Sequence, residues 1–329
     1  MTKRLLTSGL FASCAALLLL APAGTQARER RPLRKRAAKA SKGATQDLLL
    51  WKVSKEGTKT SYLFGTIHLP DARVLKLPAP VEEAFEGSDA FYGELTMDPS
   101  QQLETTQRMM LAPGEDLRKI LGKRLANRAA LLLKRRKLPM QPFMQMKPWA
   151  LISQMQLLDF LPQLQMGLKP LDGMLMARAK KAGKETGGLE RAADQLELFE
   201  SLSQRALRQM FKAGLDGIEK AEKKKEVAAE PLIQSYLRGD MDSILAATRR
   251  DVKKSKEGRA FLKRLLDDRN LSMAKAIDAK LGKEPQKSYF FAIGALHMAG
   301  DEGLVELLQA KGYTLERVAR PAPSAPGKP

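Results

Sequence analysis

The chain has few of the residues that form disulfide bonds or bind metal ions in clusters. Its 329 residues include one Cys and two His. A single Cys excludes a disulfide framework within the chain. Two His exclude a His-rich metal store, but they leave room for a small site that uses both. Aromatic residues make up 5% and charged residues 29%, which excludes a polytopic membrane protein and a low-complexity chain. The length is enough for one large domain or two ordinary ones with a substantial core.

The first 27 residues are typical of a secretory signal peptide. Two basic residues precede an apolar run, Leu5–Leu20, and small residues up to Ala27 supply a cleavage region. The alternatives are an uncleaved anchor, although about 16 apolar residues are short of the ~20 needed to span a bilayer, and lipidation at Cys14. We expect cleavage after Ala27 and export to the periplasm or beyond. The mature chain would lack Cys, which suits an oxidising compartment.

The net charge of +20 is unevenly spread along the chain. Residues 28–42 hold eight basic residues, one acidic residue and almost nothing apolar, so this segment cannot pack a core. We therefore expect residues 28–46 to be a disordered linker. It is either a solvated spacer or an electrostatic tether to an anionic envelope polymer or a lipid surface, whereas nucleic acid is not expected as a partner of an exported chain. Residues 319–329, rich in Pro and Ala, are expected to be disordered as well.

Between these ends, residues 47–318 read as one domain of the α/β (α+β) class. Two short apolar runs separated by turn residues, at 48–53 and 61–67, predict a hairpin. Further strands are predicted at 90–94, 185–189, 289–293 and 314–318, and helix-prone segments fill the intervals, among them 194–214, 215–229 and 259–281. This order predicts a mixed central β-sheet from N- and C-terminal strands, closed by a C-terminal βαβ piece, with a large helical middle region as a cap or insertion.

The two histidines occupy equivalent positions in two similar segments. Each follows an apolar strand and each stands three residues after a Gly, in the GxxH motifs Gly65–His68 and Gly294–His297. Since Gly makes up ~7% of average sequence, both histidines would follow a Gly at this spacing by chance roughly once in 200. Sites in α/β sheets lie outside the carboxyl ends of strands, and imidazole is the commonest metal ligand. We therefore expect the two rings to share one metal site, the alternative being two unrelated histidines.

A divalent ion held by two imidazoles would also want a carboxylate and an open position. Glu94 ends an apolar strand and is the first candidate. Glu190 follows the segment Gly187–Leu189 and is a second, and for each a solvent-facing acid is an equal alternative. Arg269 and Asn270 lie in a charged helical segment, where the residues alone favour a solvated face. The chain contains no GxSxG, HExxH, P-loop or dinucleotide-binding motif.

The order of these motifs resembles the TraB/GumN family, which includes the Tiki proteins. The resemblance spans residues 48–318 and rests on the GTIH and GALHMAG motifs with the following Gly303 and Gly312–Tyr313, on Gly93–Leu95, on Gly188–Glu190 with Gln195, and on Asp268–Asn270. It implies a fold similar to erythromycin-esterase-like (EreA) and ChaN-like proteins. It also implies a metal-dependent hydrolase site in which His68, His297 and Glu94 hold the metal, with Glu94, Arg269, Glu190 and Asn270 as the catalytic group. Tiki members are described as metalloproteases that favour manganese or cobalt.

The activity expected from this resemblance is hydrolysis of a peptide or related amide with Mn²⁺ or Co²⁺, or alternatively Zn²⁺. The ion would polarise a carbonyl and lower the pKa of a water, Glu94 would ligate the ion or accept the proton, and Arg269 would hold a substrate carboxylate or stabilise an oxyanion. Two other readings stay open: a haem- or metal-binding protein without catalysis, and an accessory protein that binds envelope polymer through residues 28–42. The sequence does not set the substrate, the metal or the oligomeric state.

Overall fold

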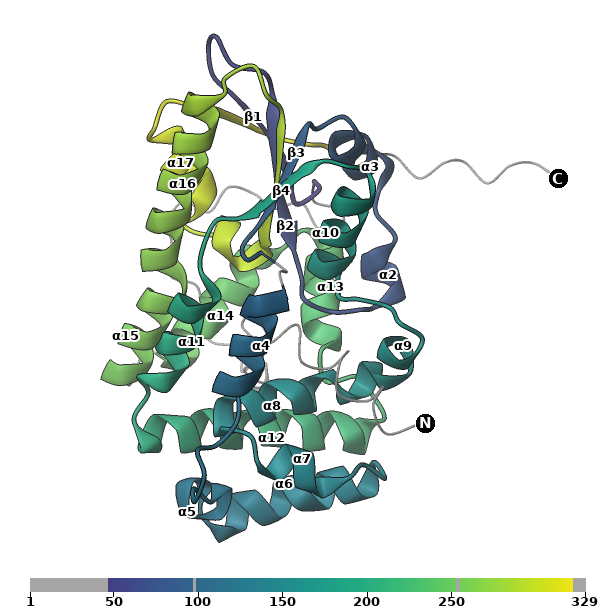
Figure 1. Ribbon diagram of the computed structural model, residues 1–329, viewed down its shortest axis with the longest axis vertical. Coiled ribbons are helices and arrows are strands. Elements are labelled where there is room, and N and C mark those ends of the chain that lie inside the picture. Colours follow the sequence, from purple (N-terminus) through teal and green to yellow (C-terminus); the bar gives the residue numbers. More distant parts are fainter. Residues whose placement is uncertain (1–46, 97–98, 253–254, 322–329) are drawn as a thin grey trace, which may run out of the picture.

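The computed structural model describes residues 47–96, 99–252 and 255–321 (Figure 1). The expected signal peptide, the basic linker and most of the C-terminal tail lie outside these residues. The described chain forms a six-stranded mixed sheet with helices on both faces and a helical lobe below it in Figure 1. The predicted mixed α/β class with a large helical middle region is therefore confirmed. None of the described helices combines the length and the apolar character needed to cross a membrane.

The sheet follows the order β4-β3-β5-β2-β1-β6. Its strands are β1 (Leu50–Ser54), β2 (Ser61–Thr66), β3 (Ala90–Gly93), β4 (Glu185–Gly188), β5 (Tyr289–Gly294) and β6 (Thr314–Arg317). β1 and β2 form the expected antiparallel hairpin. β6 pairs antiparallel with β1 at the far edge of the sheet, so that β2 and β1 lie between β5 and β6. The pairs β4-β3, β3-β5 and β5-β2 are parallel. The carboxyl ends of four neighbouring strands therefore meet at one end of the sheet, which is where sites in such sheets lie.

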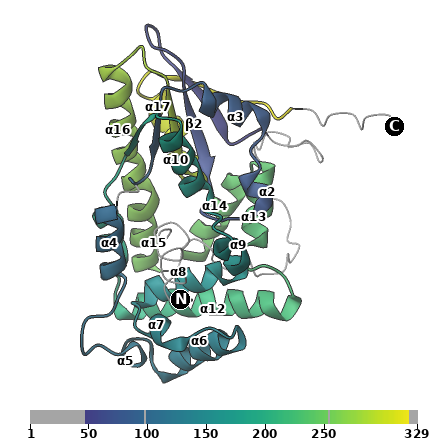
Figure 2. The same ribbon diagram turned by 45° about the vertical axis from the view of Figure 1, so that its right-hand side comes forward.

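Helices cover both faces of the sheet (Figures 1 and 2). On one side lie α3 (Ala79–Glu86) and α10 (Leu171–Lys181), and on the other α16 (Arg269–Lys283) and α17 (Leu304–Gln309). The remaining elements are α2 (Ala72–Leu75), α4 (Pro99–Arg108), α5 (Leu117–Leu121), α6 (Lys123–Arg135), α7 (Met140–Met144), α8 (Pro148–Gln156), η2 (Leu157–Phe160), α9 (Leu161–Gln165), α11 (Ala192–Glu200), α12 (Gln204–Lys224), α13 (Glu230–Arg238), α14 (Met241–Val252), α15 (Lys256–Lys263), the π turn η3 (Arg264–Asp268) and the 3-10 turn η4 (Ala295–Met298).

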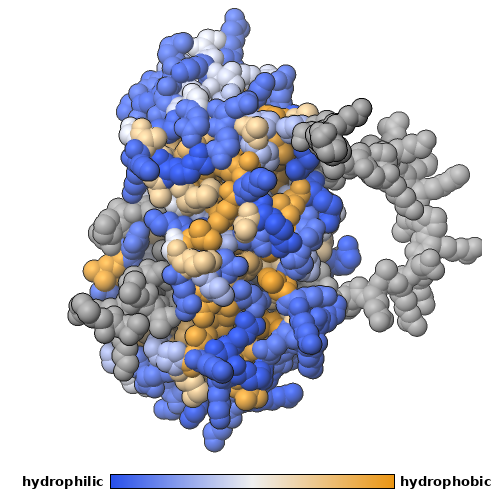
Figure 3. Space-filling view, turned by 90° about the vertical axis from the view of Figure 1, so that its right-hand side faces the viewer, coloured by the Kyte–Doolittle hydropathy of each residue, from blue (hydrophilic) through white to orange (hydrophobic). Residues whose placement is uncertain are grey.

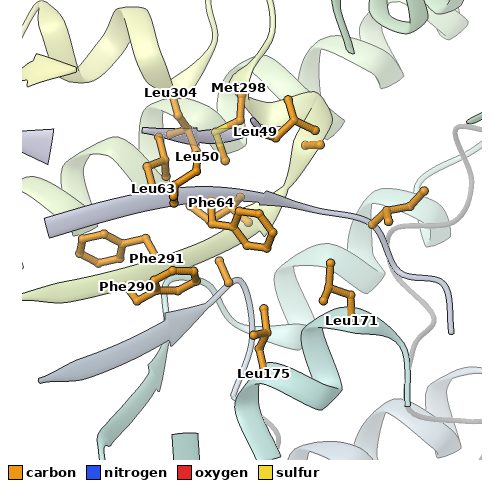
Figure 4. Packing of buried hydrophobic residues seen from close by; sticks show 14 of the residues in the cluster. Leu49, Leu50, Leu63, Phe64, Leu171, Leu175, Phe290, Phe291, Met298 and Leu304 are labelled. Carbon is orange, nitrogen blue, oxygen red and sulfur yellow. The ribbon is translucent and has the colours of Figure 1, made fainter. Parts of the chain in front are cut away.

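The continuous apolar run of β5 builds the core on both faces of the sheet (Figure 4). Because successive side chains of a strand point to opposite faces, Phe290 packs against Phe64 and Phe85, with ring centroids 5.7 and 5.5 Å apart. Its neighbours Tyr289 and Phe291 stack on each other on the other face. Aromatic side chains of β5 therefore pack on both faces of the sheet that leads to the site.

The helical lobe has a hydrophobic core of its own. Trp149 of α8 stacks on Phe199 of α11 with ring centroids 5.5 Å apart, and Phe211 of α12 is fully buried in the same cluster. Hydrophobic residues also form a band on the surface that runs from the sheet region towards the lobe, with hydrophilic residues on both sides of it (Figure 3). The buried cluster around Trp149, Phe199 and Phe211 shows that the middle region is a packed body and not an open insertion.

The predicted break between residues 214 and 215 is wrong, because α12 runs uninterrupted through this point. The chain breaks instead before Ser203, whose hydroxyl caps α12 by accepting a hydrogen bond from the Ala206 N–H. Gly214 serves a close helix contact, since a Cβ at this position would lie 2.4 Å from a side-chain carbon of Ile152. The predicted helix over 259–281 is confirmed as part of a continuous helical run from 256 to 283, which contains the π turn η3.

Candidate active site

Four parallel strands each lead into one polar side chain at the same end of the sheet. His68 follows β2, Glu94 follows β3, Glu190 follows β4, and His297 lies in η4 directly after β5. Gly294 marks the point where they meet: a Cβ there would lie 3.6 Å from Nε2 of His68 and 3.5 Å from Cδ2 of His297. The same position is 2.9 Å from Oε1 of Glu94. The structure therefore brings both GxxH imidazoles and the first candidate carboxylate to one place.

His68 is held by a carboxylate that the sequence pattern did not single out. Its Nδ1 lies 2.7 Å from Oδ2 of Asp172 in the first turn of α10, and the Thr66 hydroxyl donates a hydrogen bond to the other oxygen of Asp172. Burial alone would lower the pKa of His68, but the charge of Asp172, its hydrogen bond to the ring and the charge of Glu94 together raise the pKa to about 9. The remaining ring nitrogen, Nε2, is buried and has no hydrogen-bond partner among the described residues.

His297 is a neutral imidazole with one ring nitrogen free to bind. Its Nδ1 lies 2.5 Å from Oδ1 of Asn270, whose Nδ2 donates to the Glu302 carbonyl at 2.7 Å. Since an amide oxygen only accepts hydrogen bonds, Nδ1 carries the proton and Nε2 keeps its lone pair. Burial, with the nearby charge of Arg269, lowers the pKa of His297 to about 3. Asn270 thus sets the tautomer that a metal ligand needs.

Glu94 is a buried carboxylate, 7% exposed, that is held in its charged form. Its Oε1 accepts the Gly294 N–H at 2.7 Å, and its Oε2 accepts hydrogen bonds from Nη2 of Arg269 at 2.7 Å and from the Gln195 amide at 3.2 Å. Burial would raise the pKa of Glu94, but the charge of Arg269, with that of His68 and the hydrogen bond from the Gly294 N–H, holds it far below its usual range. A carboxylate this acidic is a good cation ligand and a weak general base.

Arg269 pairs with Glu94 and Glu190 at the same time. Its Nε lies 3.1 and 3.0 Å from the two carboxylate oxygens of Glu190, and its Nη2 donates to Oε2 at 2.7 Å. The Gln195 amide also donates to Glu190, at 3.0 Å. Burial would lower the pKa of Arg269, but the two carboxylates raise it. The guanidinium is therefore already occupied and cannot take a substrate carboxylate without giving up a partner.

The solvated helix face expected for residues 267–270 is wrong for Arg269 and Asn270. The Arg269 side chain is 11% exposed and Asn270 is 2% exposed, because both are turned inward at the start of α16. The π turn before this helix supplies a further hydrogen bond, from Nη1 of Arg269 to the Leu265 carbonyl at 3.1 Å. The charged residues around them in the sequence do not indicate this burial. Only the resemblance to the TraB/GumN family indicated that Arg269 and Asn270 belong to the site.

A cavity of about 440 Å³ opens beside this layer of ion pairs. Its lining includes the ion-paired residues Glu190, Gln195 and Arg269, together with Gly188 at the end of β4 and Arg264 of η3. The cavity is next to the candidate ligands and is large enough for several atoms of a bound molecule.

The residues present fit a divalent ion in their donor chemistry. Nε2 of His68, once it has released its proton because the pKa of this ring is about 9, Nε2 of His297 and the Glu94 carboxylate are donors that Zn²⁺, Mn²⁺ and Co²⁺ accept. Asp172 and Asn270 orient the two rings as hydrogen-bonded partners of metal-ligating histidines do. The described residues contain no ready group of three or more His, Cys, Asp and Glu that could hold an ion. Both carboxylate oxygens of Glu94 already accept hydrogen bonds, from the Gly294 N–H and from Arg269. Its Oε1 lies 3.8 Å from Nε2 of His68.

Comparison with known proteins places this site in context. The model of the TraB/PrgY/gumN family matches residues 49–317. The chain is 26% identical to "Metalloprotease TIKI1" of Homo sapiens, over 94% of this chain and 70% of the relative. It is 25% identical to the Danio rerio "Metalloprotease TIKI1", over 81% of this chain and 62% of the relative, and 24% identical to the "Metalloprotease TIKI homolog" of Nematostella vectensis, over 82% and 66%. It thus spans only about three fifths to seven tenths of the length of these relatives. No solved structure matches the chain.

Proposed function

Because the chain belongs to the TraB/PrgY/gumN family, we propose that it is an exported metal-dependent hydrolase that cleaves a peptide or related amide. Relatives that are named metalloproteases support the reaction class and a divalent metal. The observation that carries the proposal is the position of the two GxxH imidazoles, which border Gly294 together with a buried, charged carboxylate.

The ion would be held by Nε2 of His68, Nε2 of His297 and the Glu94 carboxylate, with Mn²⁺ or Co²⁺ expected and Zn²⁺ as the alternative. Bound there, a divalent ion supplies a Lewis acid that polarises a carbonyl and acidifies a water. We assign Glu94 to the ion and not to proton transfer, because its pKa lies far below neutrality. Asp172 and Asn270 hold the two rings in position.

Arg269 acts first as a positioning residue for Glu94. Together with Glu190 and Gln195 it forms a hydrogen-bonded layer between the ion site and the cavity, in which each polar group is held by at least one other. It would stabilise negative charge on a substrate oxygen only by exchanging one of its carboxylate partners. Glu190 keeps the guanidinium in this place, so its contribution is to the shape of the site.

Residues 1–27 support the proposal of export, and the +7 segment at 28–42 supports a tether to an anionic envelope polymer or lipid surface. Cell fractionation with and without residues 1–27 tests the export. Replacing the eight basic residues by Gln tests the tether, which predicts loss of salt-sensitive binding to anionic vesicles or polymer with hydrolysis unchanged.

Hydrolysis of a mixture of internally quenched peptides tests the function directly. The mature chain is assayed with Mn²⁺, Co²⁺, Zn²⁺ or a chelator, beside His297→Ala and the control Gly282→Ala, whose added methyl group meets nothing within 4 Å. We expect metal-dependent cleavage by the wild type and the control and none by His297→Ala. A wild type that neither binds metal nor cleaves would contradict the proposal. A Soret band lost in His68→Ala would identify a haem-binding protein instead.

A further inference from the structure

We propose that the outer edge of β4 binds the peptide substrate as an additional β-strand. The inference rests on the proposed function and adds how the substrate is held. It assigns the substrate class as an extended peptide with several residues on one side of the cleaved bond.

The register of β4 leaves half of its backbone groups facing outward. β4 is an edge strand that pairs only with β3, and the Leu189 N–H just beyond it donates to the Gly93 carbonyl at 3.0 Å. Because backbone groups of alternate residues point to the same side, Glu185 and Gly187 face β3 as well. Thr186 and Gly188 therefore present their N–H and C=O groups to the outside. Among the described residues, no turn, loop or cap hydrogen bond of the backbone uses these four groups, and β4 has no second neighbouring strand.

The edge is protected by its short length and by one charged residue, but it has none of the other devices that usually protect an exposed strand. Its four residues, Glu185–Gly188, contain no Pro, no Lys and no bulge, and the strand is partly exposed along its whole length. Its one charged side chain, Glu185, is bound by the Tyr92 hydroxyl and by Lys287. The two glycines make room for the chain itself, since a Cβ at Gly187 would lie 2.2 Å from the Tyr92 ring and a Cβ at Gly188 would lie 2.6 Å from the Thr96 backbone nitrogen. Unpaired strand edges of this kind bind extended peptides in known recognition modes.

The strand leads directly into the candidate site. Gly188 is on the wall of the 440 Å³ cavity, and Glu190, two residues further on, pairs with Arg269. With strands ~4.8 Å apart, a chain added to β4 lies roughly 15 Å from the end of β5, where the histidines meet. An extended chain covers this distance in about four to five residues at ~3.3 Å each. The segment bound to β4 is therefore separated from the cleaved bond by that many residues, which would line the cavity and then pass over the layer of Glu190, Gln195 and Arg269 to the ion site.

The cavity suits polar side chains of such a connecting segment. Besides the ion-paired layer, its walls carry charges of both signs, from Arg191 and Arg264 on one hand and Asp194 and Asp268 on the other. Mixed charge favours polar residues over a long apolar side chain at this part of the substrate.

A backbone-modification series tests the proposal. A quenched peptide that the metal-loaded wild type cleaves is shortened from each end and then N-methylated at one backbone amide at a time. We expect kcat/KM to fall at least tenfold when one arm has fewer than about four residues. Within that arm, N-methylation should cost activity at every second position, because only alternate amides face β4. Equal effects at neighbouring positions, or none, would overturn the proposal.

A matched pair of variants tests the protein side. Thr186→Pro removes an outward N–H without touching the bonds to β3, and Thr186→Ala keeps the N–H. We expect Thr186→Pro to raise KM at least tenfold with unchanged metal content, and Thr186→Ala to stay within twofold of wild type. If Thr186→Pro does not fold, the peptide series alone decides.

The outcomes separate this proposal from the function on which it rests. Cleavage that depends on neither peptide length nor N-methylation refutes strand addition and leaves the hydrolase intact. No cleavage by the wild type with any of the three metals refutes both. A dimer in sedimentation that Thr186→Pro dissociates would show that a second copy of the chain takes the edge, and would also overturn the proposal.

Discussion

The Nδ1 nitrogen of His68 lies 2.7 Å from a carboxylate oxygen of Asp172, although 104 positions separate the two residues in the sequence. Because this contact fixes the ring and leaves Nε2 as the donor, Asp172→Asn should weaken binding of Mn²⁺ about 10–100-fold. Asp278→Asn, which removes a carboxylate that binds Lys311 and Tyr313, is the control. Isothermal titration with Mn²⁺ measures both, and equal affinities in the two variants would show that the contact has no part in metal binding.

Gly294→Ala should disturb the site by its methyl group alone. The backbone at this position has φ of −49°, which Ala adopts without strain, but the new Cβ would lie 2.9 Å from Oε1 of Glu94. We expect at least tenfold weaker metal binding and a similar loss of hydrolysis. Gly282→Ala changes the same group where there is open space and should leave both unchanged. Unaltered metal binding by Gly294→Ala would place the ion elsewhere.

Arg269→Gln should destabilise the fold strongly, because it leaves the buried carboxylates of Glu94 and Glu190 without their cation. Losing one partner of a buried ion pair costs about 3–5 kcal/mol. Arg73→Gln removes a partner of similar ion pairs at the surface, where its side chain is 44% exposed, and should cost at most about 1 kcal/mol. Urea unfolding at pH 7 compares the free energies of unfolding. Equal values would mean that Arg269 is not needed to hold the layer together.

Asp267→Asn should stabilise the protein at neutral pH and not in acid. Burial, together with the neighbouring Glu302 carboxyl, raises the pKa of Asp267 from its ordinary 3.8 to about 6, even though Arg249 lies 3.3 Å away. The folded state therefore binds more protons than the unfolded state between these values, and stability falls as the pH rises through this window. We expect a gain of about 1 kcal/mol in the free energy of unfolding at pH 7.5, after allowing for solvent screening, and none at pH 3.5. A gain that is the same at both pH values would contradict this cause.

Local patterns were enough to predict the sheet and part of the site. The strands β2, β3 and β5 are short apolar runs next to turn residues, so Glu94 and the two histidines could be assigned to strand ends. Parallel pairing of β5 with β2 then brings the GxxH motifs together. No local pattern predicts the order of the strands in the sheet. Only the equivalence of the two GxxH motifs indicated that their histidines would meet.

Asp172 shows what sequence reasoning missed. An acidic residue in the first turn of a helix is so common that it carries no signal of function. Its role depends on where α10 packs against the sheet, which is a tertiary property. The same holds for Arg269 and Asn270, because a charged helical segment normally faces solvent. Burial of Arg269 and Asn270 is offset by partners that are distant in sequence, among them Glu94 and Glu190 just after β3 and β4 and His297 in η4.

Metal content of the purified mature chain tests the central claim most directly. Elemental analysis after equilibration with Mn²⁺ or Co²⁺ and removal of free ion is compared for the wild type, His68→Ala, His297→Ala and Gly282→Ala. We predict about one ion per chain in the wild type and in Gly282→Ala, and a loss of most of it in each histidine variant. Full metal content in both histidine variants, or none in the wild type, would contradict a shared site at the ends of β2 and β5.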